Sequence, residues 1–498
     1  MVSMQRPLIY KLEDMLKIVK NYWFLLVIFV LVLVLFFPVL NTYFTGDDFF
    51  HFKVSQTDGS FISFMKLFGF YTFEKRGIAF YRPIFREATF NIFHSLFGLN
   101  HLPFRILQLA IHLVNINLVY VFTFKLIRSK YVAFFSTFFF GISAANVGSL
   151  YYLAGGIQAQ GALMFTLFSL ISFLNKKKIL SFIFFLLAIS SHEIVICLPF
   201  LLVGIEFLQR RKFVLKNYLN FAPYFVILLV YLYLNVFVIG FSANEAQYKP
   251  SLNPKTLVNT LSWYISWSLG LPEMFVDFLL PGFKLNPDLL KYWGSYFKYI
   301  FPAFFLSVAI LFVLVLRIMK DILKDKKVCF LISWFILGIL PVLLLPLHKK
   351  TYYLQVSLPA LWTLIGYMSY RSAGSHPAGK YIKSLLIISL IVLNISSIKL
   401  AGKTYWAAQR GRAAEKLIKD VKSQYPTLPK GAGVFVKNDP NYPFINKEWG
   451  GTSKQAYFIL NGSDALQLLY KDNSLKVYYE DIEIPKEILI KEFVAKLP

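Results

Sequence analysis

The chain has 498 residues, of which 57% are hydrophobic and only 16% are charged, against roughly 25% charged in a soluble globular protein. This deficit, with many long apolar runs, argues against a soluble protein and predicts a mainly helical protein that crosses a membrane several times. The formal net charge is +26. Most basic residues stand in short loops between apolar runs, so membrane topology explains the excess and we expect no nucleic-acid partner.

The first apolar stretch follows a basic N-terminal segment and has no small-residue cleavage site. It therefore predicts an uncleaved span with a cytoplasmic N-terminus. A span needs about 20 apolar residues, fewer where a helix is partly buried. On this basis eleven spans are expected, near residues 22–41, 104–127, 131–150, 160–175, 179–191, 194–208, 219–241, 295–317, 328–347, 351–371 and 381–400.

These spans place all the strongly basic loops on the cytoplasmic side. Residues 257–283 are apolar but broken by Gly270 and Pro272. We expect an interfacial or re-entrant hairpin there, or two crossings, because a single crossing would invert every later loop. The predicted total is therefore eleven to thirteen spans.

Two domains are expected. Residues 1–400 form the transmembrane domain, with a long extracytoplasmic loop at 41–103. Residues 401–498 hold 11 of the chain's 26 acids and predict a small extracytoplasmic α/β domain. An amphipathic helix is expected at 404–424 and short strands within 431–439, 456–460 and 475–481.

The long loop opens with "TYFTGDDFFHF", residues 42–52, which places Asp47, Asp48 and His51 among aromatic residues. One interpretation is an ordinary cap at the start of a helix. The other is a general base, with a neighbour that binds a cation or orients an acceptor. Interfacial helices are expected further along the loop, near Phe61–Phe70 and Pro83–Phe97.

The same loop contains "AFYRPIFREATF", residues 79–90. Arg82 and Arg86 lie four residues apart and share a helix face, next to Tyr81 and Glu87. They either anchor an interfacial helix by snorkelling to headgroups, or Arg82 holds a lipid-linked phosphate, which its planar guanidinium suits.

Later candidates stand at predicted outer turns. His192 and Glu193 interrupt an apolar run, and they either face a cavity or stand at a hairpin tip exposed to water. Gln158 and Gln160 are expected in a short outer loop, where they would contact a sugar. Lys349 and Lys350 lie on the outer side, where the charge rule disfavours lysine, so we expect either snorkelling or phosphate binding. His348 stands beside them at the same predicted outer end of a span. Tyr352 and Tyr353 belong to the membrane-interface aromatic belt or line a sugar site.

No nucleotide-binding motif is present, which weakens any reading that depends on ATP or a nucleotide sugar. No cofactor is firmly indicated. A divalent metal is possible, although His94, His101 and His112 match no standard zinc spacing. The two cysteines both stand in apolar segments and predict neither a disulfide nor a metal framework.

Taken in order, these motifs resemble the GT-C superfamily of polytopic glycosyltransferases. Those enzymes carry an acidic pair just after the first span, where "TGDDFFHF" stands. Bacterial protein O-mannosyltransferases, aminoarabinose-transferase-like enzymes and tetratricopeptide-tailed O-mannosyltransferases often begin the second loop helix with Tyr-Arg-Pro, as "FYRPIFREATF" does. "SLFGLNHLPFRILQLAIHLVN" continues the likeness into the second span. At "SHEIVICLP", Glu193 matches the family's Lys-Glu dipeptide, but His192 replaces the lysine.

The resemblance covers residues 20–210 and, more loosely, 340–371. It implies an inverting transfer of a sugar from a polyprenyl phosphate to an acceptor hydroxyl on a protein, glycolipid or glycan. The first acid of the pair is generally the base, which selects Asp47, with Asp48 as its partner. Arg82, Lys349 and Lys350 would then stabilise the leaving phosphate. The resemblance also implies a bacterial plasma membrane location.

Two other classes stay open. A transporter or flippase of lipid-linked glycans predicts ionisable residues at mid-span and repeated halves. A non-catalytic scaffold predicts that the loop acids can be replaced freely. In this sequence the ionisable residues gather at the predicted outer ends and no repeat is visible, which favours the enzyme.

Overall fold

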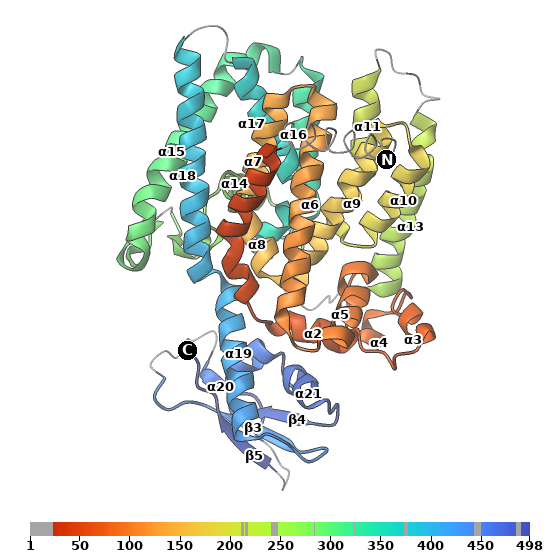
Figure 1. Ribbon diagram of the computed structural model, residues 1–498, viewed down its shortest axis with the longest axis vertical. Helices are drawn as coiled ribbons and strands as arrows, with labels where there is room; N and C mark the ends of the chain where they lie inside the picture. Colours follow the sequence, from red (N-terminus) through yellow and green to blue (C-terminus); the bar gives the residue numbers. More distant parts are fainter. Residues whose placement is uncertain are drawn as a thin grey trace, which may run out of the picture.

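The computed structural model describes residues 23–498 except 211–213, 215–217, 241–247, 283, 323, 373–376, 443–449 and 485–489. The predicted cytoplasmic N-terminus, with Arg6, Lys11, Lys17 and Lys20, therefore lies outside the described residues. Long helices run side by side in a bundle, and a small α/β domain sits at one end of it (Figure 1). The chain has the mainly helical, multi-pass fold that the composition predicts.

Seven described helices are long and apolar enough to cross a membrane: Trp23–Asn41, His101–Ile127, Leu153–Leu174, Leu219–Ile239, Pro287–Arg317, Lys326–Leu343 and Gly379–Gln424. The bundle that contains them is built from η1 (Phe37–Asn41), α6 (His101–Ile127), α7 (Lys130–Gly141), α8 (Asn146–Tyr151), α9 (Leu153–Leu174), α10 (Lys178–Ile189), η3 (Glu193–Cys197), α11 (Leu198–Gln209), η4 (Leu219–Phe221), α13 (Ala222–Tyr233), η5 (Leu234–Ile239), α14 (Pro254–Leu269), η7 (Glu273–Phe278), α15 (Pro287–Ile322), α16 (Lys326–Leu343), η8 (Thr351–Leu354), α17 (Leu358–Ser372) and α18 (Pro377–Thr404).

Each of the eleven predicted spans contains a helix. Four of these helices, α7, α10, α11 and α17, have 12 to 15 residues, so the number of crossings stays a prediction. The broken stretch 257–283 holds the end of one helix, α14, which stops at Gly270 with φ of 121°. The segment after it forms η7 and a two-residue hairpin, β1 (Leu279–Leu280) with β2 (Lys284–Leu285), so the described part of 257–283 contains no second long helix.

The loop after the first span is compact because its phenylalanines form a core. It contains α2 (Gly46–Val54), α3 (Phe61–Lys66), α4 (Phe73–Arg76), the π-helix η2 (Pro83–Ala88) and α5 (Thr89–Phe97). Phe44, Phe52 and Phe104 are fully buried, and the Phe44 ring centroid lies 4.9 Å from Phe52 and 5.2 Å from Phe104. Edge-to-face packing of this kind fixes α2 against the start of α6.

The tail begins with α19 (Trp406–Gln424), which continues below α18 in Figure 1. It then forms a three-stranded parallel sheet in the order β4–β3–β5, from β3 (Gly433–Lys437), β4 (Lys476–Tyr479) and β5 (Ile490–Val494). Two helices, α20 (Thr452–Leu460) and α21 (Asp464–Tyr470), connect β3 to β4. Parallel strands need such helical crossovers.

One predicted strand of the tail is wrong. Residues 456–460, "AYFIL", were expected to be extended, but they form the end of α20. A short apolar run cannot be assigned to strand or helix by periodicity alone. Here Ala456, Ile459 and Leu460 are the buried positions, which is the spacing of a helix face. Strand β5 was not predicted, because its pattern is weak in the sequence.

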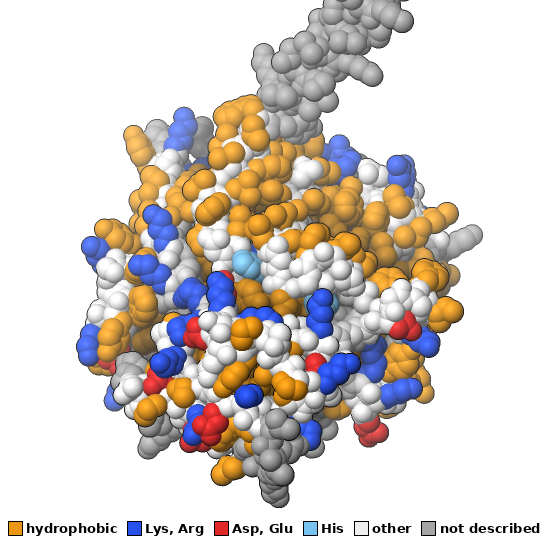
Figure 2. Space-filling view, turned by 60° about the horizontal axis from the view of Figure 1, so that its bottom comes forward, with side chains coloured by type: hydrophobic (Ala, Val, Ile, Leu, Met, Phe, Trp, Pro, Cys, Tyr) orange, Lys and Arg blue, Asp and Glu red, His pale blue; other side chains and the backbone are white. Residues whose placement is uncertain are grey.

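The tail and the loop share one hydrophobic core. Phe44 and Phe49 belong to the same buried cluster as Leu417 and Val434 of the tail. The backbones also approach closely: a Cβ on Gly411 of α19 would lie 2.7 Å from the carbonyl oxygen of Tyr43. Figure 2 shows this end of the molecule, where Lys, Arg, Asp and Glu gather, while hydrophobic side chains dominate the part behind it.

We expect Gly411→Ala to loosen the tail, because the added Cβ meets backbone that cannot move aside. Overpacking of this kind costs roughly 1–3 kcal/mol. The matched control is Gly294→Ala in helix α15, where a Cβ meets nothing within 4 Å and stability should rise by about 0.5–1 kcal/mol. Thermal unfolding followed by tryptophan fluorescence measures both, and equal effects at the two sites would contradict close packing at Gly411.

Candidate functional site

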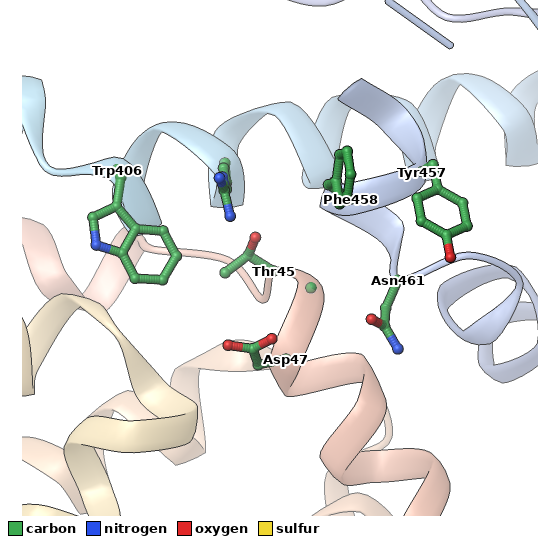
Figure 3. Close-up of a pocket in the computed structure, with 8 residues that line it drawn as sticks. Thr45, Asp47, Trp406, Tyr457, Phe458 and Asn461 are labelled. Carbon is green, nitrogen blue, oxygen red and sulfur yellow. The ribbon is translucent and has the colours of Figure 1, made fainter. Parts of the chain in front are cut away.

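Asp47 lies at the edge of a cavity of about 270 Å³ between the loop and the tail. The cavity is lined by Thr45, Gly46, Asp47, Trp406, Arg410, Tyr457, Phe458 and Asn461. Figure 3 shows the Asp47 carboxylate below the cavity, Trp406 on one side, and Phe458, Tyr457 and Asn461 of the tail on the other. The cavity volume is near the lower end of the range for small-molecule sites, about 300–1,000 Å³.

Asp47 is exposed, although it stands in the first turn of α2, and one of its oxygens is oriented by a buried phenol. The Tyr152 hydroxyl donates to Asp47 Oδ2 at 2.5 Å. Burial, and then the charge of Asp47, raise the pKa of Tyr152 well above its usual value. Tyr152 therefore stays protonated and holds the carboxylate in one orientation.

Asp48 points the other way and is fully buried. Its Oδ2 accepts from the backbone N–H of Thr45 at 3.0 Å, and its Oδ1 accepts from the N–H of Ala154 at 2.8 Å. One carboxylate thus caps the starts of two helices, α2 and α9. Burial raises the pKa of Asp48 to about 7, although the Arg105 guanidinium and the two N–H donors oppose that rise.

His51 follows on the buried side of α2. Its ring centroid lies 5.2 Å from that of Phe90. Burial, and then the charges of Arg86 and Arg82, hold its pKa well below the usual value. The imidazole is therefore neutral at physiological pH, and it packs against the phenylalanine core away from the cavity lining.

Arg82 forms a two-pronged ion pair with Glu193. Nε donates to Glu193 Oε2 at 2.7 Å and Nη2 to Oε1 at 2.5 Å, while Nη1 donates to Gln158 Oε1 at 3.0 Å. The predicted loop position of Gln158 is wrong, because this residue is buried inside helix α9. Burial acts to raise the pKa of Glu193, but Arg82 outweighs it and lowers that pKa to about 2. The guanidinium edge that suits a phosphate is thus occupied by a carboxylate.

His192 and Arg86, which lie close to the Arg82–Glu193 pair, bond to backbone groups and carboxylates nearby. Burial, and then the charge of Arg82, lower the pKa of His192 to about 3, and its Nδ1 accepts from the N–H of Ile194. Arg86 donates to the carbonyls of Ala79 and Phe80 and to the carboxylate of Glu87.

Tyr81 hydrogen-bonds through its hydroxyl to the Phe68 carbonyl at 3.0 Å. Its backbone N–H donates to Asn235 Oδ1 at 2.8 Å. The bond to Asn235 ties the loop to the bundle, while the Tyr81 hydroxyl bond and the Arg86 bonds connect parts of the loop to one another.

The basic turn before η8 reaches the cavity through aromatic contacts. Lys350 lies over the Trp406 ring, 5.5 Å from its centroid, and 3.9 Å from Glu273. Lys349 donates to Asn259 at 3.4 Å. After Thr351, the side chains of Tyr352 and Tyr353 are buried, with ring centroids 4.2 Å apart.

A band of rings joins the predicted residues. Tyr152 packs against both Trp406 and Tyr352, with centroid distances of 5.0 and 5.5 Å. Tyr353 in turn contacts His192 at 5.9 Å and His348 at 5.6 Å. The acidic pair, the Arg82–Glu193 pair and the Lys349–Lys350 turn therefore lie at the same end of the bundle and are linked by these rings.

The sequence reading missed the part of the cavity that comes from α19 and α20. Trp406 and Arg410 are four residues apart, so they share a helix face, and Arg410 lies 5.1 Å from the Trp406 ring centroid. Burial lowers the pKa of Arg410, while the charge of Asp47 opposes that shift. The spacing of Trp406 and Arg410 in the predicted helix 404–424 could have indicated from the sequence that they contribute to the same site.

The described side chains do not form a metal site. Among the described residues, no group of three or more His, Cys, Asp or Glu side chains is placed to hold a metal ion. The ring centroids of His94 and Phe52 lie 5.1 Å apart, and His112 of α6 donates from Nε2 to the carbonyl of Gly141 in α7 at 3.3 Å. These histidines contact separate parts of the core.

Comparisons with known proteins add one fold-level finding. No family model matches the chain, and a search of curated proteins gives no match. Among solved structures, the chain is similar to the archaeal oligosaccharyltransferase AglB from Archaeoglobus fulgidus, in complex with an inhibitory peptide and a dolichol-phosphate. The TM-score is 0.42 at 12% identity, over 84% of this chain and 62% of that chain. The chain thus spans less than two thirds of the length of that protein.

We expect substitution of Asp48 to lower the free energy of unfolding more than substitution of Asp47. Asp48→Asn replaces one acceptor oxygen with an N–H₂ group and leaves a buried backbone N–H unpaired, which costs about 1–3 kcal/mol. Asp47→Asn removes only an exposed charge from the first turn of α2, worth less than about 1 kcal/mol. The thermal unfolding midpoint in detergent measures both, and an equal loss for the two variants would contradict the capping role of Asp48.

The same carboxyl makes stability depend on pH. Its pKa is raised from 3.8 to about 7 on folding, so the folded state binds more protons than the unfolded state between these values. This contribution to stability is therefore full below pH 4 and is lost as pH rises through 7. We expect the stability advantage of the natural chain over Asp48→Asn to shrink from pH 5 to pH 8. An advantage that grows over that range would contradict the raised pKa.

Proposed function

We propose that this protein is an inverting glycosyltransferase. It moves a sugar from a polyprenyl phosphate to an acceptor hydroxyl in the cavity between the long loop and the tail. The observation that carries the proposal is Asp47, an exposed carboxylate that a buried phenol orients at the edge of this cavity. The ordered resemblance to the GT-C superfamily supports the same reaction, and we expect it on the extracytoplasmic side.

The acceptor hydroxyl attacks the anomeric carbon while Asp47 takes its proton. The bond between that carbon and the phosphate oxygen breaks, so the lipid phosphate leaves with the electron pair and the sugar changes anomeric configuration. Tyr152 occupies Oδ2 of Asp47, which leaves Oδ1 to accept the hydroxyl proton. General-base catalysis of this kind contributes roughly 10²–10⁴-fold.

The leaving phosphate needs fixed positive charge. Arg410 and Lys350 both lie against the Trp406 ring, which forms part of the cavity wall. We therefore assign phosphate contact first to these two cations, with Lys349 beside them. Arg82 is engaged by Glu193 on both prongs, so a phosphate would have to displace that carboxylate. We propose that the Arg82–Glu193 pair instead positions the loop against the bundle.

We expect Asp47→Asn to lower donor turnover by roughly 10²–10⁴-fold, because the amide cannot take a proton. The purified full-length protein is incubated with a panel of synthetic polyprenyl-phosphate sugars and short glycan or peptide acceptors. Release of free polyprenyl phosphate is measured by mass spectrometry. The matched control is Asp58→Asn, an exposed acid of the same loop outside the cavity lining.

The outcomes separate two claims. If the natural chain releases lipid phosphate and Asp47→Asn keeps full activity while folded, the assignment of the base is wrong but the reaction stands. If no donor in a panel covering hexoses, pentoses and amino sugars is turned over, the proposed reaction is wrong. Equal losses in Asp58→Asn and Asp47→Asn would show a general effect of loop charge.

A further inference from the structure

A second cavity, of about 350 Å³, lies at the end of the bundle away from the tail. Four helix ends meet there: the last turns of α6, α9 and α11, and the first turn of α16. Its polar lining contains four cations, Lys125, Arg128, Lys326 and Lys327, and a single acid, Asp325. This cavity has no part in the proposed glycosyl transfer.

The acid cannot balance these charges because it is already engaged. Asp325 accepts from Arg371 at 2.6 Å and from the Tyr367 hydroxyl at 2.8 Å, and its other oxygen accepts from the N–H of Lys327. No carboxylate of the described part of the chain forms an ion pair with any of the four cavity cations. Because Arg371 already pairs with Asp325, the charges of the four cavity cations are not balanced by any described carboxylate.

The lysines are held at the cavity. Lys327 Nζ donates to the Ile127 carbonyl at 3.4 Å, and Lys326 lies over the Phe207 ring at 4.5 Å from its centroid. Both stand in the first turn of α16, where the helix dipole disfavours a cation. Simple compensation of helix dipoles explains basic residues at the end of α6, but it does not explain these two.

Apart from Gln209, the remaining wall of the cavity is apolar. Leu126, Leu174 and Leu208 line it and are half-buried. A cationic pocket with an apolar wall, between the ends of membrane helices, matches a phospholipid, in which a phosphate and acyl chains adjoin. A free phosphate would use the cations and leave the leucines in contact with water.

We propose that this cavity binds the headgroup phosphate of an anionic phospholipid, with the first methylenes of its acyl chains against the leucine wall. The basic residues at this end of the bundle would then bind a specific lipid, and would also determine the orientation of the helices in the membrane.

The test uses the purified full-length protein in detergent micelles. Dioleoyl phosphatidylglycerol, dioleoyl phosphatidylcholine and inorganic phosphate are each titrated in, and bound adducts are counted by native mass spectrometry. The natural chain should retain one phosphatidylglycerol in preference to phosphatidylcholine. Lys125→Gln/Arg128→Gln should weaken that binding on the order of tenfold or more, since each cation near an anionic lipid is worth about 1 kcal/mol.

The matched control is Lys176→Gln/Lys177→Gln, which removes two exposed cations outside the cavity lining. The control also matches the backbone conformation, because Lys176 has a positive φ like Arg128. Loss of lipid binding in the cavity variant but not in the control supports the proposal.

Three results would overturn the proposal. They are equal binding of the two lipids by the natural chain, equal weakening in the cavity and control variants, and displacement of the lipid by inorganic phosphate at matched concentration. If the double variant does not fold, Lys326→Gln, which changes an exposed amine, replaces it with the same expected direction of effect.

Discussion

The candidate site depends on one buried carboxylate. Asp48 accepts from the N–H of Thr45, the N-cap of α2, and from the N–H of Ala154 in the first turn of α9. It thus fixes the loop after the first span to a helix more than a hundred residues later. The buried Arg105 of α6 completes the joint, because it donates to the carbonyls of Thr42, Tyr43 and Tyr151. Two adjacent acids repel each other, and the hydrogen bonds of Asp48 explain why one of the two is present: it holds two helix starts together. It also leaves Asp47 facing the cavity, beside Tyr152.

The tail completes the site as well as covering it. Its helix α19 supplies Trp406 and Arg410, and its helix α20 supplies the facing aromatic wall. These groups stay in place because the tail shares a hydrophobic core with the phenylalanines of the loop. The band of rings from Trp406 through Tyr152 to Tyr353 then connects the acidic pair to the basic turn. A cavity built from two segments so far apart in the chain requires both to be folded together.

The sequence predicted what depends on local pattern. The helical multi-pass fold, helices in the loop near Phe61–Phe70 and Pro83–Phe97, and the helix at 404–424 are confirmed, because apolar run length and amphipathic spacing determine them. That the loop helices lie at a membrane interface stays a prediction. The helix over 456–460 and strand β5 were missed, since short runs in a tail carry little periodicity. The division of roles between Asp47 and Asp48, and the pairing of Arg82 with Glu193, depend on contacts between distant segments. A single sequence contains no record of such contacts.

The most direct test of the central claim is an experimental structure of the protein with a bound polyprenyl phosphate. The account predicts the phosphate against the Trp406 wall, within hydrogen-bond distance, about 3 Å, of Arg410 or Lys350. It also predicts that Asp47 Oδ1 faces the space beside that phosphate. Two results would contradict the account: a phosphate bound on another face of the bundle, or a cavity that is filled by side chains of the protein itself.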